Sequence, residues 1–166
     1  MSDVSRSPEF PPSSYRPALP GEEAVAAFVR AFYGRVRGDA LIGPLFERAL
    51  AGAWDAHLGK MDDFWSSIVL GTKRYRGHVL AKHLTLAGVE GRHFDRWIEL
   101  FVATAHETFD DVVAAEFVRP ALRIASSLQL GMFGWEYEIP ASQHALLKTY
   151  VKARPVLRAE AAWETG

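Results

Sequence analysis

Apolar residues recur every three or four positions in several stretches of the chain, which is the spacing of one buried helix face. The first stretch follows Gly21-Glu22-Glu23, where acidic residues in the first turn suit the helix dipole. Its apolar positions are Val25, Phe28, Val29, Phe32 and Val36, with Tyr33 near the edge of the stripe. A second helix is predicted over about 54–70, ended by Gly71. Its apolar face carries Trp54, His57, Leu58, Met61, Phe64, Trp65 and Ile68.

Four more helices are predicted further along the chain, at about 78–84, 92–108, 111–133 and 142–153. Pro120 falls inside the third of these, so we expect a kink or a delayed helix start there. Between the first two strong helices, Gly43-Pro44 has the composition of a turn. No alternating β pattern occurs at any length, so the predicted fold class is all-α.

The chain divides by composition into three parts. Residues 1–20 are rich in Pro and Ser and are predicted to form a flexible arm. Residues 21–133 carry the helical pattern and are predicted to form one domain. Residues 134–166 form a C-terminal extension with one predicted helix, which could serve as a partner surface or pack on its own domain.

Charge and cysteine usage exclude several classes of function. The formal net charge is −1, without the basic excess of a nucleic-acid-binding protein. The absence of cysteine excludes disulfides, thiolate-bound haem, iron–sulfur clusters and cysteine-based zinc sites. No signal peptide or membrane-spanning run is visible, so no membrane insertion and a cytoplasmic location are expected.

Two histidines are the strongest candidates for metal ligands. His83 lies late in a short predicted helix, where its Nδ1–H can bond the carbonyl of Val79 and leave Nε2 for a metal. His57 falls on the apolar face of the second helix. Taken alone, His83 is equally a partly exposed histidine at a helix C-terminus, and His57 a core histidine bonded to backbone.

Two amphipathic aromatics strengthen the case for a cofactor pocket. Tyr33 and Trp97 each bring one hydrogen-bond donor to a predicted apolar face. Four polar groups on the apolar faces of four helices are typical of a site that binds a large, flat cofactor. The competing hypothesis is a mononuclear metal site held by both histidines. It needs a third ligand, and Asp62 and Asp63 fall off the buried face.

The stretch from about residue 32 to residue 133 resembles the truncated haemoglobins, specifically the group III class. The residues that carry the resemblance are Phe32-Tyr33, Gly43-Pro44-Leu45-Phe46, Trp54-x-x-His57, Phe64-Trp65, Tyr75-x-Gly77, His83, Phe94-Asp95-x-Trp97 and Ile124-Ala125-Ser126. The resemblance implies a two-over-two helical globin that encloses haem b. The proline-rich arm, Pro120 and the segment after Gly134 depart from the compact family pattern.

The resemblance also implies roles for individual residues. His83 would be the proximal iron ligand, and Tyr33, His57 and Trp97 would line the distal side. Phe46 and Met61 would be pocket walls, and His57 could alternatively bind iron as a sixth ligand. The basic and polar residues expected near the haem propionates are Lys60, Lys82, Arg74 and Tyr75.

The expected ligands are oxygen, nitric oxide and carbon monoxide. Three distal donors predict slow oxygen release, which favours ligand chemistry over bulk transport. Nitric oxide dioxygenase-like activity or weak peroxidase activity is expected, with an unidentified reductase as partner. The alternatives are a non-catalytic gas sensor or ligand store, and a haem-free helical interaction domain.

Overall fold

The computed structural model describes residues 18–152. Within this range every regular element is an α-helix, the helices are joined by turns and loops, and there is no strand. The helices are α1 (Glu22–Gly38), α2 (Gly43–Leu50), α3 (Trp54–Leu70), α4 (Val79–His83), α5 (Gly91–Thr108), α6 (Asp111–Phe133) and α7 (Ala141–Lys152). The all-α prediction is therefore confirmed. The predicted arm lies almost wholly outside the described residues.

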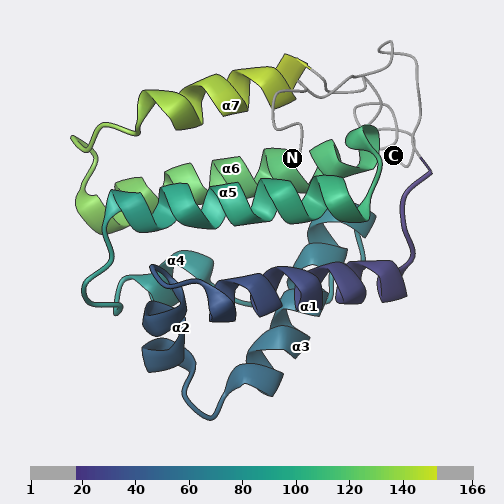
Figure 1. Ribbon diagram of the computed structural model, residues 1–166, viewed down its shortest axis with the longest axis horizontal. Helices are drawn as coiled ribbons and strands as arrows, with labels where there is room; N and C mark the ends of the chain where they lie inside the picture. The colour runs from purple at the N-terminus through teal and green to yellow at the C-terminus, as the bar shows by residue number, and fades with distance from the viewer. Residues whose placement is uncertain (1–17, 153–166) are drawn as a thin grey trace, which may run out of the picture.

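The helices form two layers (Figure 1). One layer pairs α1 with α3, and the other pairs α5 with α6, whose contact is the most extensive in the molecule. α1 also packs on α5, which joins the layers. The short helices α2 and α4 lie at one end of the α1–α3 layer, and α7 lies along α6. This arrangement is the predicted two-over-two sandwich with one added helix.

Aromatic side chains fill the space between the layers. Phe28 of α1 is fully buried, with its ring 5.2 Å from that of Phe101 and 4.9 Å from that of Phe117. Trp65 of α3 packs 4.9 Å from Phe101. Burying a side chain of this size stabilises the fold by about 1.5–3 kcal/mol. These four rings come from four helices, so they fix the relative positions of both layers.

The turn predicted at Gly43-Pro44 is instead the start of α2. Pro44 lies in the first helical turn, where its missing N–H has no partner to lose. A Cβ on Gly43 would lie 2.9 Å from the carbonyl oxygen of Arg37, so glycine allows the chain to pass close to the end of α1. Glycine and proline here shape a helix start as well as the turn before it.

Asp39 holds this corner against the second layer. One carboxylate oxygen accepts hydrogen bonds from the N–H groups of Leu41 and Ile42, both at 3.0 Å. The other accepts from Arg96 of α5 at 2.7 Å. Burial raises the pKa of Asp39, but these donors outweigh burial and lower it overall. The ionised carboxylate thus joins the α1–α2 corner to α5.

Pro120 lies inside α6. Of the two alternatives predicted there, a kink or a delayed helix start, the delayed start is wrong. The helix begins at Asp111, with the Asp110 side chain accepting from the N–H of Val113 at 2.9 Å. An internal proline costs about 3 kcal/mol or more. The buried stripe of α6 continues through this point with Phe117, Val118, Ala121 and Leu122, and its packing offsets that cost.

The extension folds back on its own domain as far as residue 152. α7 packs on α6 through a buried amide pair, in which Gln129 Nε2 donates to Gln143 Oε1 at 2.7 Å. Gln143 in turn donates to Asp95 of α5 at 2.6 Å. Tyr150 lies 2.7 Å from His106 Nε2, and it is almost fully buried. The predicted helix at 142–153 is therefore present over the described residues.

Candidate functional site

His83 is the last residue of α4, a short helix without buried residues. Its Nδ1 donates to the carbonyl oxygen of Val79 at 2.7 Å, as the sequence predicts. A carbonyl can only accept, so Nδ1 carries the proton and Nε2 keeps its lone pair. The hydrogen bond therefore fixes the tautomer that a metal ligand needs and limits rotation of the ring.

His57 lies across from His83 and has an unusual environment. Its Nε2 atom is buried and makes no hydrogen bond with the described residues. Burial, together with the nearby basic side chains of His83, Lys60 and Lys82, lowers the pKa of His57 to about 4. The electrostatic effect of His83 on His57 indicates that these two side chains lie near each other. The His57 ring is neutral near pH 7 and carries an unpaired polar atom, which a native fold rarely leaves without a reason.

Tyr33 packs directly against His57. The two ring centroids are 4.9 Å apart and the rings are perpendicular. Tyr33 is almost fully buried, and its hydroxyl has no hydrogen-bond partner among residues 18–152. Burial raises its pKa well above the ordinary tyrosine value, so the hydroxyl keeps its proton. Tyr33 can therefore donate a hydrogen bond next to His57.

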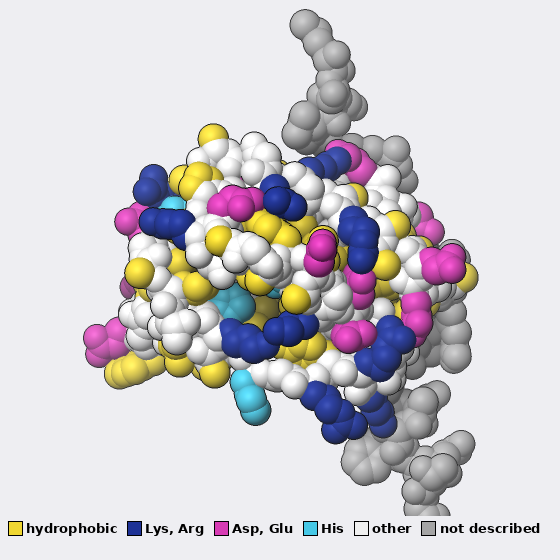
Figure 2. Space-filling model, turned by 90° about the horizontal axis from the view of Figure 1, so that it is seen from below, with side chains coloured by type: hydrophobic (Ala, Val, Ile, Leu, Met, Phe, Trp, Pro, Cys, Tyr) yellow, Lys and Arg dark blue, Asp and Glu magenta, His cyan; other side chains and the backbone are white. Residues whose placement is uncertain are grey.

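Apolar side chains around these groups are left incompletely buried. Phe46 and Met61 pack against the core on one side but stay partly exposed, as do Leu58 and Phe64. This differs from the predicted α3 face, because the fully buried residues of α3 are Trp54, Trp65, Ser66 and Val69. Figure 2, a view from below Figure 1, shows a hollow with hydrophobic side chains inside it and a histidine at its edge.

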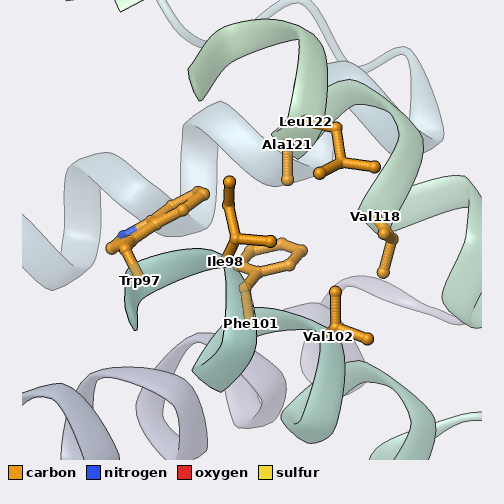
Figure 3. Close-up of a pocket in the computed structure, with 7 residues that line it drawn as sticks. All are labelled: Trp97, Ile98, Phe101, Val102, Val118, Ala121 and Leu122. Carbon is orange, nitrogen blue, oxygen red and sulfur yellow. The ribbon is translucent and has the colours of Figure 1, made fainter. Parts of the chain in front are cut away.

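Trp97 lies at one end of a crevice between α5 and α6 (Figure 3). This crevice has no room for even a water molecule, so it is a packing seam and not a ligand pocket. The Trp97 ring packs on Phe32 at 5.5 Å and on Phe101 at 5.1 Å. Its indole nitrogen lies on the side away from Ile98 and Phe101 (Figure 3), and no described residue accepts its hydrogen bond.

The basic residues expected at the rim fall into two groups. Lys60 and Lys82 are exposed and close enough for their charges to act on His57. Figure 2 shows Lys and Arg side chains along one edge of the hollow. Arg74 instead pairs with Glu22 at 3.1 Å and Asp63 at 3.3 Å, so its charge is already satisfied.

Tyr75 also has partners of its own. Its ring packs edge-on against Phe64 at 5.0 Å, and its N–H donates to Ser67 Oγ at 3.0 Å. The ring also covers Gly77, where a Cβ would lie 2.4 Å from the Tyr75 hydroxyl oxygen. Nothing in these contacts joins Tyr75 to the two histidines.

A second pocket of about 240 Å³ lies behind α4, against α6. Its lining is mostly apolar and consists of Val79, Leu80, Arg123, Ile124, Ser127 and Leu128. Leu80 reaches across to Gly131 of α6, where a Cβ would lie 2.4 Å from the leucine Cδ1 atom. Glycine at 131 therefore allows α4, and with it His83, to sit close to α6.

The mononuclear metal hypothesis gains no third ligand. Among residues 18–152, no three His, Asp or Glu side chains gather into a group that could hold a metal ion. Asp62 accepts from Arg30 at 3.0 Å, and Asp63 pairs with Arg74. Both carboxylates are thus used in ion pairs on the outer side of α3.

Comparison with known proteins gives the family. No family model matches the chain. The "Group 3 truncated hemoglobin ctb" of Campylobacter jejuni subsp. jejuni serotype O:2 is 31% identical over 111 residues, which cover 65% of this chain and 87% of that protein. The chain belongs to the group III truncated haemoglobins.

The fold agrees with this assignment. The crystal structure of a group III truncated haemoglobin from Campylobacter jejuni superposes with a TM-score of 0.67 at 27% identity. The match covers 75% of this chain and all of the neighbour. This truncated haemoglobin therefore has the family's two-over-two core, as the resemblance implied. No helix in its described part is both long and apolar enough to span a bilayer.

Sequence reasoning assigned no role to two other histidines that have clear structural ones. His93 caps α5: its Nδ1 accepts from the N–H of Glu90 at 2.8 Å, and the Glu90 side chain accepts from the His93 N–H. His106 donates to Asp111 at 2.8 Å and contacts Tyr150, which helps to attach α7. The Glu-x-x-His spacing before α5 is a signal that could have revealed the first role.

Proposed function

We propose that this truncated haemoglobin binds haem b in the hollow between α3 and α4 and uses it for chemistry on oxygen or nitric oxide. The observation that carries the proposal is the buried, unpartnered Nε2 of His57 in the same site as His83. A polar atom in that setting is explained by a ligand that fills the hollow. The half-buried apolar walls and the lysines at the rim fit a flat, apolar molecule with anionic groups at its edge.

The residues present fit haem in three ways. His83 would hold the iron through Nε2, because Nδ1 is occupied by Val79. Phe46 and Met61 would contact the ring, and Lys60 and Lys82 would neutralise the propionates. When bound, haem supplies an iron that takes up diatomic gases and changes oxidation state.

The distal side would then be lined by Tyr33, His57 and Trp97. The hydroxyl of Tyr33 and the indole N–H of Trp97 are both without partners in the described chain, so each can donate to a ligand. Neutral His57 can donate if its proton is on Nε2. Such donors in a site shielded from water stabilise negative charge on a bound gas and slow its release.

Slow release favours chemistry on the ligand over oxygen delivery. The Nδ1 of His83 bonds a backbone carbonyl and not a carboxylate, so strong peroxidase activity is not expected. Oxidation of nitric oxide to nitrate is the reaction that best suits three donors around oxygen. An unidentified reductase would return the iron to its ferrous state.

Rapid mixing with nitric oxide tests this reaction. The haem-loaded ferrous protein, equilibrated with oxygen, is expected to yield one nitrate and one ferric haem per nitric oxide within the mixing time. Stopped-flow absorbance and nitrate analysis measure the two products. A slow reaction without nitrate would contradict the enzymatic role and favour a gas sensor or ligand store.

A further inference from the structure

Outside the hollow, three residues contact one another at the corner where α1, α2 and α3 meet. The indole Nε1 of Trp54 donates to Glu47 Oε1 at 3.1 Å. Arg37 donates to the same oxygen at 3.3 Å, and its guanidinium carbon lies 4.4 Å from the centroid of the Trp54 ring. We call Arg37, Glu47 and Trp54 the indole clamp.

Within the clamp, the Trp54 ring makes both a hydrogen bond and a cation–π contact. Glu47 fixes the edge of the indole and Arg37 covers its face, so the ring cannot rotate without losing both contacts. Arg37 and Glu47 are each about half exposed, with side-chain exposures of 49%, whereas Trp54 is only 7% exposed. An exposed ion pair contributes little to the stability of a fold. The position of Arg37 and Glu47 around a buried ring is therefore better explained by a role in holding that ring in place.

The inner side of the same indole faces the two polar residues of the hollow. The Trp54 centroid lies 6.1 Å from that of His57, with the rings perpendicular, and 6.2 Å from that of Tyr33. Phe46, the neighbour of Glu47, stacks on Trp54 at 6.3 Å and contacts Tyr33 at 6.0 Å. Trp54 therefore lies between Arg37 and Glu47 at the surface and the Tyr33–His57 pair inside.

His57 has few other restraints. Its Nε2 has no hydrogen-bond partner among residues 18–152, so ring packing against Tyr33 and Trp54 is what orients it there. A side chain without a hydrogen bond keeps one orientation only if its neighbours are fixed. The clamp supplies that fixed neighbour.

We propose that Trp54, held by Glu47 and Arg37, is a positioning residue that orients His57 and Tyr33 toward a ligand in the hollow. The orientation of His57 by the clamp follows from contacts within this chain. The effect on a bound gas rests on the proposed function. Loosening the clamp should let the His57 ring move and should weaken hydrogen bonding to the ligand.

The test uses the whole 166-residue chain and four variants, one of them a control. Glu47→Ala removes the acceptor, while Glu47→Gln keeps an amide oxygen that can still accept from the indole. Arg37→Gln removes the cation from the ring face and gives an independent second variant. Glu107→Ala is the matched control, because it breaks another exposed ion pair made by α1, between Arg35 and Glu107 of α5. Neither residue of that pair contacts His57 among residues 18–152.

The first readout is the NMR signal of the His57 ring in the diamagnetic carbon monoxide form. In the wild type, ring currents from Tyr33, Trp54 and the bound haem set the position of this signal. Glu47→Ala and Arg37→Gln are expected to move it away from the wild-type position, whereas Glu47→Gln and Glu107→Ala should leave it close to wild type. An unchanged His57 signal in both Glu47→Ala and Arg37→Gln would overturn the proposal.

The second readout is the infrared C–O stretch of the same carbon monoxide form, which reports hydrogen bonding to the ligand. Glu47→Ala should shift it toward the Tyr33→Phe value and speed oxygen release by about 2- to 10-fold, the effect of weakening one hydrogen bond. If the wild type binds no haem, the proposed function fails. The NMR comparison is then made on the chain as isolated, so the clamp is still tested.

Discussion

Replacing His83 with glycine is expected to release haem from the protein. Its Nε2 is the nitrogen that the Val79 hydrogen bond leaves available, and no other described histidine in the hollow has a fixed tautomer. Mutating even an outer partner of a metal ligand costs about 10–100-fold in affinity, so loss of the ligand itself should exceed about 100-fold. Transfer of haem to excess apomyoglobin measures the dissociation rate.

Free imidazole should partly restore the His83→Gly variant, because it can enter the space left by the side chain and bind the iron. His78→Ala is the matched control: His78 is an exposed histidine just before α4, and its loss should leave haem retention unchanged. Haem held by His83→Gly as tightly as by the wild type would show that another group anchors it.

Removing a distal donor is expected to speed oxygen release. Trp97→Phe deletes an indole N–H and Tyr33→Phe a hydroxyl, and both keep most of the ring packing with Phe32. A hydrogen bond to a charge-rich partner contributes about 1.5–3 kcal/mol, so each change should raise the dissociation rate by about 10- to 100-fold. Stopped-flow replacement of oxygen by carbon monoxide gives the rate.

Trp→Phe and Tyr→Phe substitutions outside the hollow are the controls for a general effect on oxygen release. Trp135 is 83% exposed and Tyr137 packs on Phe133 of α6, so Trp135→Phe and Tyr137→Phe should leave oxygen release as in the wild type. A wild-type rate in Trp97→Phe would remove Trp97 from the set of donors. A slower rate in Tyr33→Phe would mean that its hydroxyl opposes the ligand.

The main helices could be predicted from the sequence because their buried faces are continuous and their ends carry strong signals. Gly71 ends α3 with a φ of 74°, a left-handed conformation that glycine adopts easily. The helix α2 was missed because it is short and its first residues are Gly43 and Pro44, which mark turns as often as helix starts. Tertiary packing decides between the two.

The contacts of the candidate site could likewise be predicted only in part from the sequence. The bond between His83 and Val79 is local, four residues apart, so helix geometry was sufficient to predict it. The indole clamp joins three helices across a corner, and periodicity carries no signal for such contacts. Arg74 shows the reverse problem: its place in the sequence, shortly before His83, predicted a position at the rim, but its guanidinium group binds Glu22 of α1.

The absorption spectrum of the purified protein during stepwise haem addition tests the central claim most directly. Binding through His83 predicts a sharp Soret band that saturates at one haem per chain and shifts when carbon monoxide is added to the reduced form. A spectrum that remains that of free haem throughout the titration would contradict haem binding, and with it the assignment of this site.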